Sequence, residues 1–381
     1  MAAFPAAGPV SLFRSGDQMK IVIVALDNDN HTAPIKWALE EAGYRVACWG
    51  GLSWEEGRQV SISFDENTQL ELGPFSVDPG DVVWIRRPNP PLHHPNVAAP
   101  DKNFAQGEYK WFSWSALYLL EKLPVRCINR YSASRLINNK SVQLLLAKRS
   151  GLHVPETLMS NSPVRVRAFL ERGPTQTICK AFFPHIWKKA NSEALAVTET
   201  FEISADRLPA NEVLTYAPAI YQTRIVKDFD VRMVLLGTTV YSYALHNPKG
   251  AIDWRQDAGQ GIVTVEPIAT PSEVEKAVLV FADQAGITFG SFDFAVDRSD
   301  KWWFLEVNEE GQFLWLDDLN PAGRILEKFL AFLTLPESSS RQTIQEREAH
   351  FPSWKDYSRS PAREQVPPEV NVGAPILSIE Q

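Results

Sequence analysis

Two neighbouring apolar runs near the end of the chain carry carboxylates at positions that restrict how the chain can fold. The runs are SFDFAVD at residues 291–297 and WWFLEVN at residues 302–308. A carboxylate is costly to bury in apolar surroundings unless a partner compensates its charge. If the runs form a hairpin whose loop is residues 298–301, Asp293 lies directly opposite Glu306, with Cβ atoms about 5 Å apart.

The same pairing places Asp297 opposite Trp302 next to the loop. A third polar residue, Asn308, lies close to the two carboxylates. Glu306 and Asn308 share one face of their strand, because successive side chains of a strand point to opposite faces. Three oxygen donors, those of Asp293, Glu306 and Asn308, are therefore expected to converge.

This set of donors predicts a magnesium site. Two carboxylates this close repel each other unless a cation lies between them. Hard oxygen ligands suit Mg²⁺, which keeps several waters and bridges substrate phosphates. The alternative is the solvated polar side of an edge hairpin. The flanking apolar residues and the spacing of Glu306 and Asn308 favour the metal site.

Phosphates bound beside Mg²⁺ need cationic partners, and two lysines are candidates. Lys180 interrupts the apolar run TICKAFF, where a lysine is costly unless it reaches solvent or meets an anion. Lys140 follows the helix-like start SASRLINNK and could extend into the same cleft. A solvated helix lysine is an equal alternative for Lys140.

Several arginines stand where a guanidinium could bind phosphate oxygens. KDFDVRMVLLG places Asp230 and Arg232 on one strand face, and DWR repeats that spacing. Two adjacent arginines end the run DVVWI, and at most one of them can face a given cleft wall. Each arginine could instead form a structural ion pair. The further residues concerned are Asp253 and Arg255 in DWR, and Arg86 and Arg87 after DVVWI.

Composition limits the class of protein. The 381 residues are 44% hydrophobic and 22% charged, which is ordinary for a globular protein with two or three lobes. The net charge of -8 argues against a general nucleic-acid binder. No run reaches the roughly 20 apolar residues of a membrane span, and the N-terminus is a poor signal peptide. Without a C-x-x-C pair, Cys48, Cys127 and Cys179 are expected to be reduced core residues of a cytoplasmic protein.

The alternation of strand-like and helix-like segments indicates an α/β (α+β) fold. Residues 1–18 read as a flexible tail, and a βαβ opening without a G-x-G-x-x-G motif follows. The polar stretch 185–200 is expected to be a loop or a flap that covers the site. Residues 336–381 are polar and rich in proline, so we expect mostly disorder there, with one short helix near 341–350.

The order of these segments resembles the ATP-grasp carboxylate–amine ligases, and more narrowly the graspetide (microviridin-type) synthetases. Those enzymes form ester or amide links between side chains of a ribosomally made precursor peptide. One departure is that Asn-Pro often precedes Gly-Gln in that family, whereas Glu309 and Glu310 stand between Asn308 and Gly311 here. The resemblance rests on VWIRRPNPP, INNKSVQLLLAKRSGLHVPETLMSN, KDFDVRMVLLG, IDWR and FLEVNEEGQFLW, within about residues 20–335.

The resemblance implies an ATP-grasp fold with an N-terminal pre-ATP-grasp βαβ domain at 19–130. A central small lobe at 131–216 and a C-terminal lobe at 217–335 would hold ATP between them. Asp293, Glu306 and Asn308 match the magnesium ligands. The other matches are Lys140 and Lys180 for phosphates and nucleotide, the stretch from Ala217 to Gln222 for adenine, with Pro218, Ala219, Ile220 and Tyr221 as its named contacts, Arg232 for phosphate, Arg255 for phosphate or the activated acyl group, and Arg86, Arg87, Asp253 and Gln312 for the substrate.

The implied reaction transfers a phosphoryl group from ATP to a side-chain carboxylate, giving an acyl phosphate and ADP. A hydroxyl or amine then displaces phosphate, and no enzyme nucleophile is needed. The implied partner is a precursor peptide with a leader and a core, and a homodimer is left open. Two rival readings are an ATP-grasp ligase that joins free amino acids or small peptides, and a phosphate-binding regulatory protein without turnover.

Overall fold

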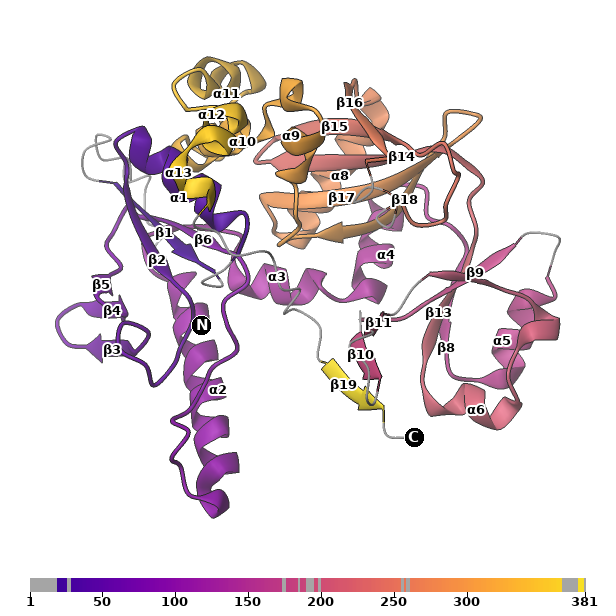
Figure 1. Ribbon diagram of the computed structural model, residues 1–381, viewed down its shortest axis with the longest axis horizontal. Helices are drawn as coiled ribbons and strands as arrows, with labels where there is room; N and C mark the ends of the chain where they lie inside the picture. Colours follow the sequence, from indigo (N-terminus) through magenta and orange to yellow (C-terminus); the bar gives the residue numbers. More distant parts are fainter. Residues whose placement is uncertain are drawn as a thin grey trace, which may run out of the picture.

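Three sheets of four or five strands organise the chain (Figure 1): an N-terminal sheet at the left, a large sheet at the upper right and a small sheet at the lower right. The computed structural model describes residues 19–25, 29–172, 176–183, 186–189, 195–197, 200–254, 257, 261–364 and 376–379. The predicted tail at residues 1–18 lies outside the described residues.

The N-terminal sheet is parallel, with the order β2-β1-β6-β7. Every residue of β1 is buried, as expected for an apolar run covered on both faces. Gly43, with a φ of 82°, ends the helix of the predicted βαβ opening. The elements are β1 (Lys20–Val24), α1 (Thr32–Glu41), β2 (Arg45–Trp49), β6 (Val82–Ile85), η1 (Ala99–Asp101), α2 (Lys102–Leu120) and β7 (Arg126–Ile128), beside an antiparallel sheet of β3 (Val60–Phe64), β4 (Thr68–Leu72) and β5 (Phe75–Ser76).

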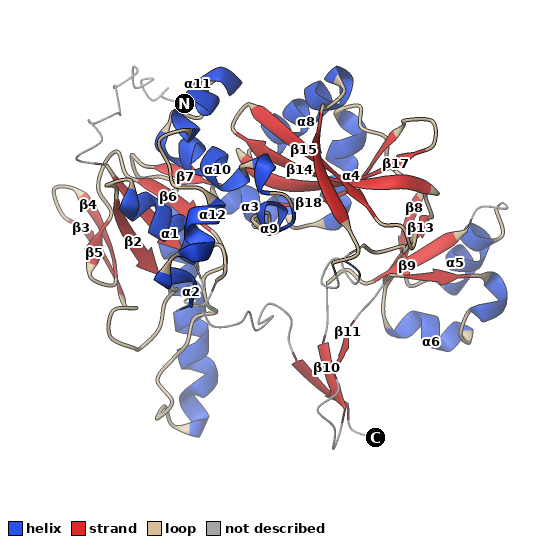
Figure 2. Ribbon diagram, turned by 45° about the horizontal axis from the view of Figure 1, so that its top comes forward, coloured by secondary structure: helices blue, strands red, loops and turns tan. Residues whose placement is uncertain are grey.

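The large sheet is antiparallel, with the order β16-β15-β14-β17-β18, and helices cover both faces (Figure 2). Alternation along β14 feeds two cores: Met233 packs in a cluster with Phe281 of α8, whereas Val234 shares a cluster with Phe329 of α10. The second cluster also contains Trp84 of β6, so it joins the large sheet to the N-terminal sheet. The elements are β14 (Lys227–Leu236), β15 (Thr239–His246), β16 (Thr264–Ile268), α8 (Ser272–Ala285), β17 (Phe289–Asp297), β18 (Trp302–Asn308), α9 (Trp315–Leu319), η3 (Pro321–Gly323) and α10 (Ile325–Thr334).

The small sheet has the order β12-β9-β13-β8, and α5 packs on it through Val166, which shares a cluster with Cys179 and Tyr221. The described parts of the predicted flap at 185–200 include two paired strands, one of which also pairs with the last described strand of the chain. The elements are β8 (Thr157–Ser160), α5 (Pro163–Leu170), β9 (Thr177–Lys180), β12 (Phe201–Ile203), η2 (Ala205–Arg207), α6 (Asn211–Tyr216) and β13 (Ala219–Thr223), with β10 (Ile186–Lys189), β11 (Leu195–Val197) and β19 (Ile376–Ile379) in the separate three-stranded sheet.

Two segments pack on a different sheet from the one that the predicted domain boundaries imply. The helices α3 (Tyr131–Ile137) and α4 (Lys140–Arg149), predicted for the small lobe, pack on the large sheet, where Ile137 and Leu146 share a core cluster with β14. Strand β13, predicted for the C-terminal lobe, pairs with β8 and β9 of the small sheet. The apolar helix faces and the strand ladder, rather than chain order, decide these placements.

The segment after Pro336 corrects a prediction of mostly disordered chain. Its described residues include three helices that pack against α1 and α10, because their apolar residues complete the N-terminal core. Phe351, Trp354 and Tyr357 are buried, and the ring centroids of Tyr357 and Trp37 are 5.5 Å apart. The helices are α11 (Arg341–Glu348), which matches the one helix predicted there, α12 (Trp354–Arg359) and α13 (Pro361–Glu364).

The three cysteines all lie in the described part of the chain and form no disulfide. Burial raises the pKa of Cys127 to about 12 and also raises the pKa of Cys179, so both stay thiols at neutral pH. Within the described residues, no helix has the length and apolar character that crossing a membrane requires.

Candidate functional site

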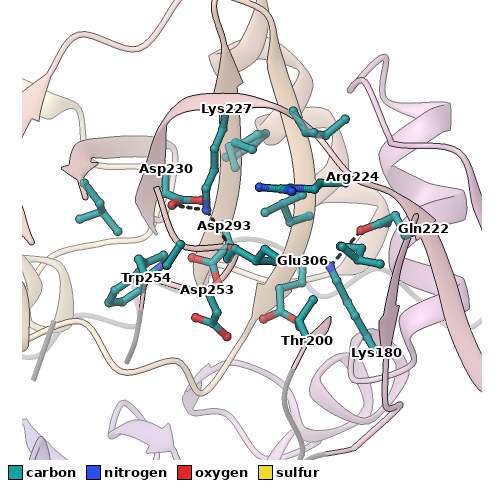
Figure 3. Close-up of a pocket in the computed structure, with 18 of the residues that line it drawn as sticks. Lys180, Thr200, Gln222, Arg224, Lys227, Asp230, Asp253, Trp254, Asp293 and Glu306 are labelled. Carbon is teal, nitrogen blue, oxygen red and sulfur yellow. Dashed lines mark hydrogen bonds and ion pairs between the residues drawn. The ribbon is translucent and has the colours of Figure 1, made fainter. Parts of the chain in front are cut away.

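A cavity of about 630 Å³ lies between the small sheet and the large sheet (Figure 3). Its walls come from β9 and β13 on one side and from β14, β17 and β18 on the other. The N-terminal domain contributes Arg87, which follows β6. The volume falls in the range of small-molecule and cofactor sites, and side chains of both charges line it.

The predicted oxygen donors meet in this cavity. Asp293 of β17 is the register partner of Glu306 on β18, and Ser291 is the partner of Asn308. All three donors, Asp293, Glu306 and Asn308, line the cavity. The sequence prediction of their convergence is therefore met in position, while their role as metal ligands stays a prediction.

The hairpin reaches this register by a route that the sequence prediction did not include. Trp302 pairs with Val296 rather than with the predicted Asp297, so the tip is displaced by one residue. A bulge between the 293/306 and 294/304 pairs then restores the predicted register. The predicted pairing at the tip was wrong, and the pairing at the carboxylates was right.

Each of the two carboxylates already faces a cation of the protein. Lys140 at the start of α4 forms an ion pair with Glu306, and the Nε of Arg232 lies 3.3 Å from Oδ1 of Asp293. Asn139 caps α4 by accepting from the backbone N–H groups of Ser141 and Val142, which fixes where Lys140 leaves the helix. The two cations offset the repulsion that the carboxylates would otherwise exert on each other.

The donor chemistry fits a magnesium ion. Asp293, Glu306 and Asn308 offer two carboxylates and one amide oxygen, all hard ligands on neighbouring strands. Among the described residues there is no group of three His, Cys, Asp or Glu side chains that could hold a metal on its own. Such a set suits Mg²⁺ with water and phosphate in the remaining positions better than Zn²⁺.

Lys180 of β9 lines the cavity from the side of the small sheet, and two linked hydrogen bonds hold its side chain there. Its Nζ donates to Oε1 of Gln222 at 2.9 Å (Figure 3). Nε2 of Gln222 donates in turn to Oγ1 of Thr157 at 2.9 Å. The sequence prediction included Gln222 only as the end of the stretch matched to adenine and gave it no role beside Lys180. The sequence did contain a sign of this role: Gln222 is a polar residue in a buried strand, two positions after Ile220 and therefore on the same face.

The segment predicted to meet adenine divides between two faces of β13. Ile220 lines a small cavity of about 60 Å³ that adjoins the main one and is shared with Lys140 and Lys180. Tyr221 points to the opposite face and packs with the core beneath α5, and Ala219 lies against the same core. Pro218 is exposed. Of the four predicted contacts, only Ile220 has its side chain in a cavity, because side chains alternate along the strand.

A second acidic group borders the cavity near Lys227. The Nζ of Lys227 lies 2.6 Å from Oδ2 of Asp230 and also donates to the carbonyl of Ile252 at 2.9 Å. Burial raises the pKa of Asp230 to about 6, although Lys227 acts in the opposite direction. Asp253 also lines the cavity, while its contact with a substrate stays a prediction. Arg255 lies outside the described residues.

The two adjacent arginines after β6 separate, as the sequence predicted, but one of them does not face the cavity. Arg87 lines it, whereas Arg86 is fully buried and its Nε lies 2.9 Å from Oδ1 of Asp29. The prediction that Arg86 contacts substrate is therefore corrected: it forms a structural ion pair behind the cavity wall. Gln312 lines the cavity.

The two extra acidic residues after Asn308 lie beside the donors. Asn138 donates to Oε1 of Glu309 at 2.6 Å. Burial, and then the charge of Glu310, raises the pKa of Glu309 to about 8. Glu309 is therefore largely protonated at neutral pH.

Known structures share this architecture across nearly their whole length. The "RiPP-associated ATP-grasp ligase" of Chryseobacterium gregarium, solved with ADP and a leader and core peptide, superposes with a TM-score of 0.74 at 23% identity and covers 85% of this chain and 99% of its own. The macrocyclase MdnC of Microcystis aeruginosa, bound to its precursor peptide, gives 0.66 at 21% identity, with 83% and 99% covered. The ATP-grasp ligase PsnB, solved with a minimal precursor, Mg and ADP, gives 0.61 at 21% identity, with 83% and 98% covered.

These likenesses establish the ATP-grasp fold of the chain, as the sequence predicted. No protein-family model matches the sequence, and no curated protein matches it either.

Proposed function

We propose that the protein is an ATP-dependent ligase that joins a carboxylate to a hydroxyl or amine within a ribosomally made precursor peptide. The observation that carries this proposal is the single cavity in which Asp293, Glu306 and Asn308 face Lys140 and Arg232. Oxygen donors for a divalent cation beside cations for phosphate are what phosphoryl transfer from ATP requires.

The nucleotide would lie between the two sheets. Ile220 gives the small cavity an apolar wall that suits a nucleotide base, and Lys180 lines both this cavity and the main one that holds the oxygen donors. Gln222 holds the Lys180 ammonium in the cavity, so the ammonium would already be oriented toward the phosphates when the nucleotide binds. This arrangement supports ATP as the phosphoryl donor.

Asp293, Glu306 and Asn308 would hold Mg²⁺, which neutralises charge that develops on the transferred phosphoryl group. Arg232 is held by Asp293, and its guanidinium carbon lies 5.8 and 5.7 Å from the ring centroids of Trp254 and Trp315. A guanidinium fixed in this way binds phosphate oxygens without a large loss of entropy. Lys140 would leave Glu306 for a phosphate oxygen when the metal binds.

The substrate carboxylate accepts the phosphoryl group and becomes an acyl phosphate, with release of ADP. A hydroxyl or amine of the same peptide then attacks the acyl carbon, and phosphate leaves. An acyl phosphate hydrolyses in contact with water, so a covering element is needed. The flap at 185–200 remains our proposal for that element, and Thr200 at its end lines the cavity.

The peptides bound in the similar structures support a peptide substrate. The Chryseobacterium ligase was solved with leader and core peptides, and MdnC with its precursor. A leader that docks on the enzyme and a core that enters the cavity are proposed here by analogy. Cytoplasmic location, where ATP is supplied, and a homodimer belong to the same proposal.

Incubation with ATP, Mg²⁺ and the short peptide encoded beside the gene tests the proposal. Intact mass should show loss of one water per bond formed, and the nucleotide product should be ADP. AMP and pyrophosphate would exclude an acyl phosphate. ADP formation with free amino acids or a dipeptide, and none with the encoded peptide, would favour the rival ligase.

A further inference from the structure

The loop at residues 309–314, between β18 and α9, connects the oxygen donors to the rest of the large lobe. Asn308 precedes it and Gln312 lies within it, and both line the cavity. The N-terminal domain holds this loop at two places by hydrogen bonds from buried side chains. The side chains of Arg86 and His31, which make these contacts, do not line the cavity, whereas Gly311, one of the residues they hold, does.

The first contact is made by Arg86. Its Nη1 donates to the backbone carbonyls of Glu310 at 2.9 Å and of Gly311 at 3.2 Å. Its Nε lies 2.9 Å from both oxygens of Asp29, and both side chains are buried. Oδ1 of Asp29 also accepts from the backbone N–H groups of His31 at 2.8 Å and of Thr32 at 3.0 Å, which anchors it to the start of α1.

The second contact is made by His31. Its Nε2 accepts from the backbone N–H groups of Phe313 at 2.8 Å and of Leu314 at 3.1 Å. An acceptor at Nε2 requires a neutral ring with its hydrogen on Nδ1. Burial and the charge of Arg86 lower the pKa of His31 well below its usual range despite Asp29, which keeps the ring neutral.

The loop has little room to move toward or away from the donors. A Cβ atom at Gly311 would lie 2.6 Å from Cβ of Ser291 and 2.9 Å from the carbonyl oxygen of Asn308. Ser291 is in turn the register partner of Asn308. A shift of the 310–314 backbone is therefore transmitted to Asn308 by direct contact.

We infer that Asp29, Arg86 and His31 are positioning residues that fix the 309–314 loop and thereby set Asn308 and Gln312 at the oxygen-donor site. Together they form a clamp between the N-terminal domain and the donors. This inference rests on the proposed function. The clamp adds to the proposed function a dependence of Mg²⁺-dependent nucleotide binding on the N-terminal domain. That domain contributes only Arg87 to the described cavity wall.

A matched control exists elsewhere between the same parts of the chain. Arg126 of β7 is also largely buried and donates to backbone carbonyls of the C-terminal lobe, those of Phe332 at 2.8 Å and Leu333 at 3.3 Å, and that of Leu335. Phe332 and Leu333 belong to the last turn of α10 and Leu335 follows it, and none of the three lines the cavity. Arg126→Met should therefore remove the same kind of contact without reaching the donors.

The test is ADP binding measured by calorimetry, once with excess Mg²⁺ and once with EDTA. In the wild type, Mg²⁺ should tighten ADP binding. Arg86→Met should raise the Kd for ADP in Mg²⁺ by about tenfold, the equivalent of one charge-assisted hydrogen bond, and leave the Kd in EDTA unchanged. Arg126→Met should lower Tm and leave the ratio of the two Kd values at the wild-type level.

His31 supplies a pair of variants that does not remove a buried ion pair. His31→Ala should reduce the Mg²⁺ enhancement about fivefold. His31→Gln should restore it, because its amide oxygen can accept near the position of Nε2. If His31 had a merely structural role, both His31 variants would have a lower Tm and the same Mg²⁺ enhancement of ADP binding.

The outcomes are distinguishable. Wild-type Mg²⁺ enhancement in both Arg86→Met and His31→Ala, with lowered Tm, would overturn the clamp while leaving the proposed function standing. Failure of the wild type to bind ADP under either condition would overturn the proposed function, and the clamp with it. If Arg86→Met does not fold, the comparison of the two His31 variants decides the inference.

Discussion

Asp293 and Glu306 lie directly opposite one another on β17 and β18, although the hairpin that joins these strands is displaced by one residue at its tip. The bulge between the tip and the carboxylates compensates the displacement. Without it, Glu306 would point to the opposite face of the sheet, because side chains alternate along a strand. The convergence of the donors thus depends on one irregular step in an otherwise regular ladder.

Glu306→Gln should reduce ADP formation by about a thousandfold, because an amide cannot supply the negative charge that a divalent cation needs. The isosteric side chain should leave the fold and Tm close to wild type. ADP release in a coupled assay measures the effect, and Glu273→Gln on the exposed start of α8 is the control. Turnover of the Glu306 variant at the wild-type rate would remove the metal assignment.

Gln222→Leu should weaken ADP binding by about tenfold, because Lys180 loses the acceptor that holds its ammonium in the cavity. Leucine has a similar volume, so the small sheet should remain folded. Calorimetric titration of ADP reports the change, with Gln106→Leu on the exposed side of α2 as the control. Equal affinities in the two variants would show that the Lys180–Gln222 contact plays no part in nucleotide binding.

Asp317→Asn should change how stability depends on pH. Burial raises the pKa of Asp317 to about 7, although its oxygens accept from the backbone N–H groups of Ile325 and Leu326 at 2.9 Å. The unfolded value is about 4, so the folded state binds more protons between pH 4 and 7. This contribution of Asp317 is present below pH 4 and is lost as pH rises through 7.

The free energy of unfolding of the wild type minus that of Asp317→Asn should therefore fall with pH over this window, by up to about 1.4 kcal/mol per unit, and level off above it. Urea unfolding at a series of pH values measures the difference. The subtraction removes the contributions of other carboxylates. A difference that stays constant from pH 4 to 8 would contradict the raised pKa.

Tyr357→Ala should lower the free energy of unfolding by about 3–5 kcal/mol, because it removes a fully buried ring from the core shared by α1 and the C-terminal helices. Tyr216→Ala is the control, since that ring is 70% exposed, and its effect should stay within about 0.5 kcal/mol. Thermal unfolding followed by circular dichroism compares them. Equal Tm values would show that the segment after Pro336 does not support the fold.

The sequence was sufficient to predict those parts of the fold and the site that follow from a local pattern of residues. The βαβ opening follows from a continuous apolar run and a glycine stop, and the three oxygen donors follow from alternation along a hairpin. The separation of Arg86 and Arg87 also follows from alternation. The sequence did not reveal which of the two faces the cavity, because that depends on Asp29, which lies 57 residues away in the chain.

The rest depended on contacts that local pattern does not encode. Proline and polar residues after Pro336 suggested disorder, but Phe351, Trp354 and Tyr357 find a hydrophobic surface on the first helix of the chain. Strand β13 joined the small sheet because β8 and β9 supply its ladder partners. Gln222 became a site residue only when that strand brought it beside Lys180.

The helices after Pro336 also bear on the order in which the chain can fold during synthesis. The hydrophobic cluster around Ile23 and Ile35 is completed by Tyr357, which is synthesised long after these two residues. Contacts of such sequence separation form slowly, and the surface they cover stays exposed until they form. The core of the N-terminal domain is therefore complete only after α11, α12 and α13 have been synthesised. A chain that stops near residue 335 should present the apolar face of α1 to chaperones.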